Sequence, residues 1–374
     1  MPYSCNIIKA LAIYLFKNTF FFFLYVIDFF LKKGFLNKMK KNLSYIKEIV
    51  SLYFPMETWE IVPGPSGENN TTLFIMANNE KYVLRIYETH QDEDKVNYEH
   101  AVLLALNERP LSFSIPVPMK TKDGQTIVKT QSGFLAGLFQ FIDGMNPALE
   151  DLVQIYSFGS TAGQLTAELA EVSVNQLPVY KAYYDMDSTH PSCSLEQMKD
   201  FSQTPSEEFV ELTQELFIIY KQLVSFQDRV PFLKRLPHQL VHGDLNASNI
   251  LTGGDGKISA ILDFEFVTHD LRVMEVAVAI SDFIDNEEDE TIIFKKITAF
   301  LNGYGSRIKL TEGEIHALPL LIQLRSLDVF IHFLGRHWDG VDSIDTVKKY
   351  IRKAAQRVSW ILIHQDNFIK FCGK

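Results

Sequence analysis

The sequence predicts an α+β fold with two lobes, a small β-rich N-lobe followed by a larger α-helical C-lobe. Residues 59–144 contain short β-like runs bounded by Gly, Pro and Asn turns, with one helical stretch among them. After residue 144 the apolar residues recur mainly at helical spacing, and one β-like island, residues 240–263, interrupts them. We therefore expect a short connector near Phe141–Gly144 and a cleft between the lobes, where ligands commonly bind.

The composition is that of a globular protein, with 374 residues of which 47% are hydrophobic and 22% charged. The formal net charge of −10 argues against a nucleic-acid-binding surface. The cysteines, Cys5, Cys193 and Cys372, lie far apart and form no CxxC pair. This spacing predicts neither a zinc site nor a disulfide framework, and it fits a reducing cytoplasm. The sequence leaves the oligomeric state open.

Residues 1–38 differ from the rest of the chain, because they are rich in phenylalanine and carry a net positive charge. Three interpretations stay open. The segment is an extension outside the domain, even a non-native start, since Met39 opens an ordinary soluble sequence. Alternatively residues 7–31 are a membrane anchor, since about 20 apolar residues span a bilayer, although Lys9, Lys17 and Asp28 interrupt them. The third interpretation is a packed amphipathic helix.

The N-lobe, residues 39–142, is predicted element by element. A short helix is expected over residues 43–54, where apolar positions recur at helical spacing. Residues 59–88 indicate three strands separated by a Gly/Pro turn and an Asn-Asn turn. Residues 92–107 have a charged start and helical periodicity, so they predict a helix. Residues 113–144 return to strands around Asp123-Gly124 and Ser132-Gly133.

The C-lobe, residues 143–374, is predicted to consist mainly of helices. Their apolar periodicity places them at residues 149–172, 206–227, 291–302, 312–336 and 343–364.

The β-like island carries the polar residues that indicate chemistry. In "LVHGDLNASNIL", residues 240–251, His242, Asp244 and Asn249 stand between apolar residues that flank them on both sides. The apolar run "ISAIL" then ends at Asp263, after a tight Gly-rich return. We expect Asp244, Asn249 and Asp263 to converge at one end of a hairpin. Two carboxylates and an amide oxygen suit Mg²⁺ and do not suit zinc.

This segment resembles the catalytic core of the aminoglycoside phosphotransferase family, small-molecule kinases with a protein-kinase-like fold that include homoserine-kinase-like and choline-kinase-like relatives. The shared pattern is H-x-D-x-x-x-x-N, then an apolar strand and D-F, here His242, Asp244, Asn249 and Asp263. Gly243 replaces the arginine of protein kinases, Glu265 replaces the glycine after Asp-Phe, and no Ala-Pro-Glu follows. These departures favour small-molecule acceptors over protein acceptors.

The resemblance implies a role for each residue of the pattern. Asp244 would orient the acceptor hydroxyl, and Asn249 and Asp263 would hold Mg²⁺ on the phosphates of ATP. His242 would brace the loop through hydrogen bonds. ATP and Mg²⁺ are therefore the expected cofactors, with GTP in place of ATP left open.

The resemblance also implies nucleotide contacts in the N-lobe. Ser66 and Gly67, in the loop "GPSGENNTT", would direct backbone amides to the phosphates, although the loop is not GxGxxG. Arg85 stands where the family usually has a lysine, and Glu99 matches the acid that pairs with it. The backbone of Gln140–Ile142 would contact adenine. An ordinary turn for the loop and surface charges for Arg85 and Glu99 are the alternatives.

Three C-lobe features bear on the site and its acceptor. Glu275 stands where relatives carry an aspartate in a short helix under the site, and we expect it to be structural. The acidic stretch from Asp282 to Glu290 is either a polycation-binding surface or a solvated loop. Arg325, Asp328 and His332 fall at i, i+3 and i+7, so they either line a pocket for an amino acid such as homoserine or form one polar helix edge.

The sequence therefore predicts an ATP- and Mg²⁺-dependent phosphotransferase that acts on a hydroxyl of a small molecule, either a metabolite, a homoserine-like amino acid or an amino alcohol. The alternatives are an antibiotic phosphotransferase of the aminoglycoside type, a protein serine/threonine kinase with this fold, a catalytically inactive nucleotide-binding regulatory protein, and a membrane-tethered binding protein. We expect no nucleic-acid partner, a membrane contact only through residues 7–31, and a cytoplasmic location.

Overall fold

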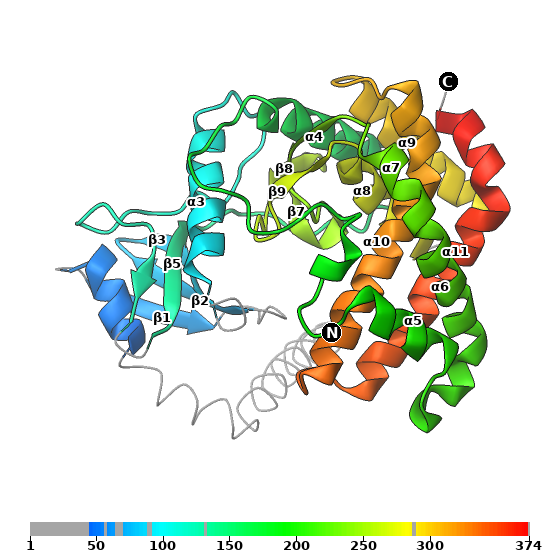
Figure 1. Ribbon diagram of the computed structural model, residues 1–374. Coiled ribbons are helices and arrows are strands. Elements are labelled where there is room, and N and C mark those ends of the chain that lie inside the picture. Colours follow the sequence, from blue (N-terminus) through cyan, green and yellow to red (C-terminus); the bar gives the residue numbers. More distant parts are fainter. Residues whose placement is uncertain are drawn as a thin grey trace, which may run out of the picture.

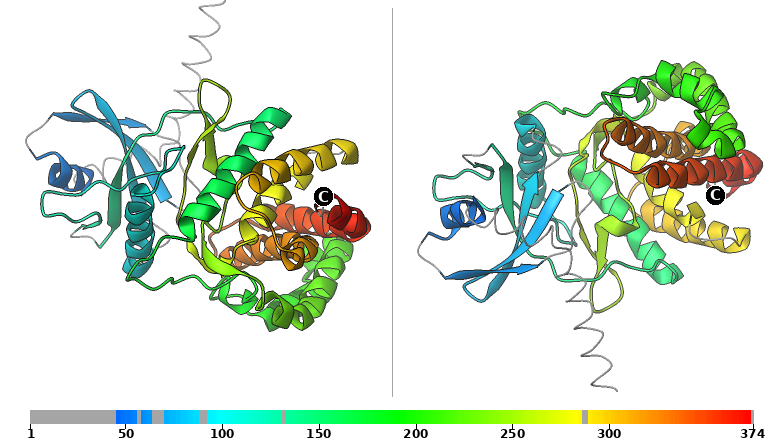
Figure 2. Two further views of the ribbon diagram at one scale, coloured as in Figure 1. Left: turned by 90° about the horizontal axis from the view of Figure 1, so that it is seen from above. Right: turned by 90° about the horizontal axis from the view of Figure 1, so that it is seen from below.

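The computed structural model describes residues 45–55, 58–63, 70–87, 92–130, 133–285 and 289–372. Within these ranges the chain forms two lobes, a smaller one built on a sheet and a larger one built of helices (Figures 1 and 2). The N-terminal segment 1–38 and the loop residues Ser66 and Gly67 lie outside the described residues.

The N-lobe is a five-stranded antiparallel sheet with the order β1-β2-β3-β5-β4. A helix over residues 45–53 covers it, and the buried residues of this helix pack against the inner sides of the strands. Asn78 and Asn79 have φ angles of 53° and 64°, as the two-residue turn between β2 and β3 requires. The strands are β1 (Trp59–Pro63), β2 (Asn70–Ala77), β3 (Glu80–Tyr87), β4 (Val128–Lys129) and β5 (Leu135–Gln140).

The helix α3 (Glu93–Asn107) connects the N-lobe to the core of the C-lobe. It begins at its N-cap Asp92, whose side chain accepts a hydrogen bond from the Asp94 N–H. Its buried residues Val102, Leu103 and Leu106 belong to the large apolar cluster that also contains the C-lobe helices. The helix therefore fixes the position of Glu99, which it carries, relative to both lobes.

The C-lobe helices are α4 (Leu152–Leu169), α5 (Leu195–Gln203), α6 (Thr213–Phe226), α7 (Val230–Leu233), α8 (Met274–Asp285), α9 (Glu290–Gly305), α10 (Glu312–Trp338) and α11 (Ile344–Cys372). The sequence did not predict α5 or the short α7. The helices α4 and α9 pack closely because glycines line their crossing. A Cβ on Gly159 would lie 1.9 Å from the carbonyl oxygen of Phe300, and one on Gly303 would lie 2.1 Å from that of Tyr156.

The helix α10 is the element that carries Arg325, Asp328 and His332. Among the described helices, it alone is long and apolar enough to cross a membrane by length and composition. However, 67% of its most apolar window is buried inside the molecule, which is what a core helix of a compact fold shows.

The β-like island contains the expected hairpin with its Gly-rich return, at residues 250–261, and its first strand belongs to a second small sheet. Strand β6 (His238–Val241) pairs with β9 (Thr268–Leu271), whereas β7 (Ile250–Thr252) pairs with β8 (Ile258–Ile261). The chain between β6 and β7, residues 242–249, is a loop in which Gly243 has φ 84°. A Cβ at this glycine would lie 2.4 Å from the Phe266 carbonyl oxygen, so the backbones approach too closely for any other residue.

Candidate active site

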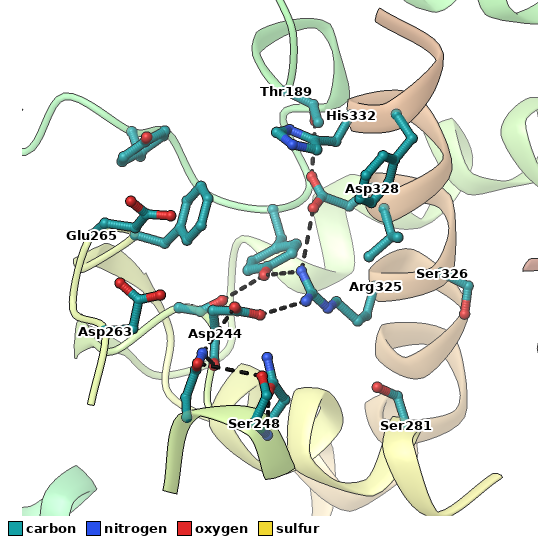
Figure 3. Close-up of a pocket in the computed structure, with 18 of the residues that line it drawn as sticks. Thr189, Asp244, Ser248, Asp263, Glu265, Ser281, Arg325, Ser326, Asp328 and His332 are labelled. Carbon is teal, nitrogen blue, oxygen red and sulfur yellow. Dashed lines mark hydrogen bonds and ion pairs between the residues drawn. The ribbon is translucent and has the colours of Figure 1, made fainter. Parts of the chain in front are cut away.

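A cavity of about 760 Å³ lies between the lobes and is lined by several of the residues that the sequence singled out (Figure 3). Strands β2 and β3 contribute Asn70 and Arg85, and the loops after β6 and β8 contribute Asp244, Asn249 and Asp263. Helices α8, α10 and α11 contribute five charged residues and one histidine to the lining, namely Asp282, Arg325, Asp328, His332, Lys353 and Arg357.

Asp244 and Asn249 are held together within the loop after β6. The Asn249 amide nitrogen donates to the Asp244 carbonyl oxygen at 2.8 Å and to its carboxylate Oδ2 at 3.1 Å. Asn246 accepts from the Ser248 N–H at 2.9 Å and caps the short 3₁₀ turn η4 (Ala247–Asn249), so it shapes the loop. Because the amide nitrogen of Asn249 is used in this way, its oxygen is the atom left for a ligand.

His242 connects this loop to the end of strand β8. Its Nδ1 accepts from the Asp244 N–H at 3.1 Å, so the proton is on Nε2, which donates to the Leu262 carbonyl oxygen at 2.9 Å. The Leu262 N–H in turn donates to the Asn249 carbonyl oxygen at 2.7 Å. Burial lowers the pKa of His242 to about 4, which keeps the ring neutral and both hydrogen bonds in place. Asn249 and Asp263 flank the open end of the β7–β8 hairpin, and these bonds tie Asp244 to them.

Glu275, at the start of α8, accepts a backbone hydrogen bond from the same loop. Its Oε1 accepts a hydrogen bond from the His242 backbone N–H. Burial raises the pKa of Glu275 to about 8, against the opposing effect of hydrogen bonds from the backbone of His242 and Gly243. The side chain is 1% exposed and does not line the cavity, so it acts on the loop and not on a ligand.

Asp263 enters the cavity from a strained backbone position, with φ 62°. Its Oδ1 accepts from the Arg85 guanidinium at 2.8 Å, and the same guanidinium reaches Glu99 Oε1 at 3.2 Å. Arg85 therefore links strand β3 of the N-lobe to the C-lobe through Asp263 and to α3 through Glu99. Burial raises the pKa of Glu99, and the positive charge of Arg85 opposes that shift.

Arg325 is the cation nearest to Asp244 among the interactions that the structure describes. Its guanidinium forms an ion pair with Asp244 Oδ1, donates to the Tyr183 hydroxyl at 2.9 Å and lies 3.6 Å from Asp328 Oδ2 (Figure 3). Asp328 also accepts from the Thr189 hydroxyl at 3.0 Å. Burial raises the pKa of Asp244, and Arg325 opposes this effect. The polar face of α10 thus lines the cavity, which is one of the two alternatives that the sequence left open.

Some residues of the site were missed by the sequence analysis. Tyr183 lies in an irregular segment without periodicity, yet its hydroxyl donates to the Gly243 carbonyl oxygen and accepts from Arg325. Asn70, at the start of β2, donates to Glu265 Oε2 at 2.9 Å across the lobes. No sequence pattern marks these contacts, because they depend on how the two lobes pack.

Other predicted residues lie elsewhere. Gln140 and Ile142 are at the end of β5 and in the connector, and neither lines the described cavity. Their adenine contact stays a prediction. Trp338 packs on Phe201 with ring centroids 6.0 Å apart and also does not line the cavity.

The donor atoms around Asp263 fit a magnesium ion. Asn249 offers an amide oxygen and Asp263 a carboxylate that is one-third exposed toward the cavity. Among the described residues, no group of three or more His, Cys, Asp or Glu side chains could hold a metal. Mg²⁺ usually takes one or two protein oxygens and completes its shell with water and substrate phosphates, so two side-chain donors are the number expected for a metal that binds together with a nucleotide.

A small mixed lobe, a larger helical lobe and an Asp/Asn/Asp cluster in the cleft between them define a small-molecule kinase of the protein-kinase-like fold. Residues 60–308 match the model of the phosphotransferase enzyme family, two-thirds of the chain, and the protein belongs to this family. It is a phosphotransferase that acts on a hydroxyl acceptor.

Sequence relatives agree with the family assignment. The chain is 25% identical to the homoserine kinase of Zymomonas mobilis over 282 residues, 74% of this chain and 80% of that protein. It is 26% identical to the homoserine kinase of Rhodopseudomonas palustris, over 68% of this chain and 72% of that one.

Among solved structures, the fold is similar to that of the amicoumacin kinase hAmiN, with a TM-score of 0.63 and 14% identity over 84% of this chain and 93% of that one. A microcompartment-associated aminopropanol kinase gives 0.59 and 17%, over 87% and 98%.

Proposed function

We propose that this protein transfers the γ-phosphate of ATP, with Mg²⁺, to the hydroxyl of a small metabolite of the homoserine or amino alcohol type. The observation that carries the proposal is the arrangement of Asp244, Asn249, Asp263 and Arg325 around one cavity between the lobes. Similarity to homoserine kinases supports a small hydroxy amino acid as the acceptor class.

Each residue has a task that its geometry supports. Asp244 lines the cavity and would accept a hydrogen bond from the attacking hydroxyl, which orients an oxygen lone pair toward the phosphorus. Asn249 and Asp263 would hold magnesium, which neutralises phosphate charge when it is bound. His242 and Glu275 keep the loop in place, so they are positioning residues.

Arg85 would neutralise charge on the nucleotide phosphates from the N-lobe side. A guanidinium can contact a phosphate through two nitrogens, and here it is already held by Asp263 and Glu99. A nucleotide would share this arginine with Asp263. The adenine contact of Gln140–Ile142 and the phosphate contacts of Ser66 and Gly67 belong to the same proposal.

The test is a screen of purified protein for ADP release with hydroxy amino acids, amino alcohols, sugars and aminoglycosides. We expect turnover with a small amino-bearing alcohol, and Asp244→Ala should abolish it while nucleotide binding persists. Asp263→Ala should weaken binding of the magnesium nucleotide as well. Normal turnover by both variants would overturn the assignment of the site. Turnover with aminoglycosides alone would instead favour the antibiotic phosphotransferase alternative.

A further inference from the structure

Arg325 contacts the residue that is proposed to meet the acceptor hydroxyl. One of its nitrogens pairs with Asp244 Oδ1, and the other is shared between the Tyr183 hydroxyl at 2.9 Å and Asp328 Oδ2 at 3.6 Å. The second oxygen of Asp244 accepts from the Asn249 amide. Both carboxylate oxygens of Asp244 therefore accept hydrogen bonds, and Oδ1 has the charged partner, Arg325.

The helical walls of the cavity carry more cationic than acidic side chains. Helices α8, α10 and α11 contribute three cationic side chains to the described lining, Arg325, Lys353 and Arg357, and two acidic ones, Asp282 and Asp328. Asp282 also accepts from the Ala247 N–H at 2.9 Å, so part of its charge serves the loop. Over the whole described lining the charges balance, because the side away from these helices carries Arg85 and Lys181 but also Asp244, Asp263 and Glu265. The cationic surplus that would attract one anionic group therefore lies on the side of the helices.

The geometry also favours a particular anionic group. A guanidinium is a planar fork of donors that matches a carboxylate in two parallel hydrogen bonds. The contact between Arg325 and Asp328 is long at 3.6 Å, so the Asp328 carboxylate has capacity for a further charged partner in the same cavity. A carboxylate on Arg325 and an ammonium group on Asp328 would both be satisfied by one amino acid.

We propose that Arg325 binds the carboxylate of a hydroxy amino acid acceptor, and that this contact replaces its ion pair with Asp244. Asp244 is then released to accept the acceptor hydroxyl, so acceptor binding itself prepares the carboxylate. The inference deepens the proposed function, because it rests on phosphorylation of a small acceptor and names which acceptor chemistry the site selects.

The test uses two acceptors that differ only in the carboxylate, L-homoserine and 3-amino-1-propanol. In the full-length wild type, kcat/KM should favour L-homoserine by about 10- to 100-fold, the range expected for a charge-assisted contact. Arg325→Met should remove this preference, mainly by raising KM for L-homoserine, and Arg325→Lys should recover part of it. Because the ratio compares two acceptors on one protein sample, a loss of folded protein cancels.

The matched control is Arg336→Met, which removes another arginine of α10 whose partner, Asp342, lies outside the cavity. This variant should keep the wild-type ratio. Equal kcat/KM values for the two acceptors in the wild type would overturn the inference, as would an unchanged ratio in Arg325→Met.

Failure of the proposed function would look different, since the wild type would then phosphorylate neither acceptor. In that case calorimetric titration of each acceptor, with a non-hydrolysable ATP analogue present, decides the inference. At least tenfold tighter binding of L-homoserine that is lost in Arg325→Met supports a carboxylate site. Equal binding, or no binding, of the two acceptors to the wild type refutes it.

Discussion

Replacing Arg85 with methionine should lower the free energy of unfolding by an amount that depends on pH. The guanidinium pairs with Glu99 at 3.2 Å and with Asp263 at 2.8 Å, and the side chains of Glu99 and Asp263 are 3% and 33% exposed. The partly exposed pair is worth at most about 1 kcal/mol, and the buried hydrogen bond about 1 kcal/mol. We therefore expect Arg85→Met to cost about 2 kcal/mol at pH 7.

Above pH 8 this cost should grow. The pKa of buried Glu99 is raised to about 8 by burial, with Arg85 opposing the rise, so loss of Arg85 raises this pKa further. At pH values between the Glu99 pKa of the folded wild type and that of the folded variant, Glu99 is protonated in the folded variant. It is ionised in the folded wild type and in both unfolded chains. The stability of the variant therefore falls by about 1.4 kcal/mol per pH unit relative to the wild type.

Urea unfolding of wild type and Arg85→Met at pH 7 and pH 9 measures this difference. The control is Lys129→Met, which removes a surface ion pair with Glu93 at 3.3 Å and should change stability by less than about 0.5 kcal/mol at both pH values. An equal cost of Arg85→Met at pH 7 and pH 9 would show that Glu99 does not depend on Arg85.

Three further predictions concern the loop, the helix packing and the pH dependence. Glu275→Ala should lower the free energy of unfolding in urea by about 1–3 kcal/mol, because the buried His242 N–H loses its acceptor. Glu275→Gln should keep most of the stability, and equal losses in the two variants would contradict this reasoning. Gly159→Ala should cost at least about 1–3 kcal/mol in thermal unfolding, because its Cβ would clash with the Phe300 carbonyl oxygen, whereas Gly305→Ala, which faces open space, should be harmless. Because burial raises the pKa of Asp244, kcat/KM should fall as the pH drops through a pKa above 3.8, and a rate that is independent of pH down to 4 would count against a role for its carboxylate.

Local sequence signals predicted the elements well where they act alone. The Asn-Asn turn, the three first strands and the capped helix α3 follow from turn chemistry and periodicity within short windows. The island at residues 240–263 followed only in part. Its hairpin with the Gly-rich return was expected, whereas the pairing of β6 with β9 was not, because β9 lies beyond the window and contains His269 and Asp270 among its four residues. A short strand of mixed polarity gives no period, so only the folded chain identifies it.

The functional site shows the same contrast between local sequence signals and contacts that form only in the folded chain. The His242, Asp244 and Asp263 pattern was visible because those residues lie within one segment, and the structure brings them together through the hydrogen bonds of His242. The partnership of Asp244 with Arg325 spans 81 residues of sequence and depends on the packing of α10 against the loop. The helical spacing indicated a polar face on α10, but no pattern could say which carboxylate that face would meet.

The most direct test of the account is transfer of phosphate to L-homoserine by the wild type and by Asp244→Asn, followed by ³¹P NMR detection of the phosphomonoester. Asparagine keeps the size of the side chain and removes the charge that attracts the hydroxyl proton. We expect product with the wild type and at least about a hundredfold slower formation with Asp244→Asn, with nucleotide binding retained. Product formation at the wild-type rate by Asp244→Asn would contradict the central claim that this carboxylate directs the acceptor hydroxyl.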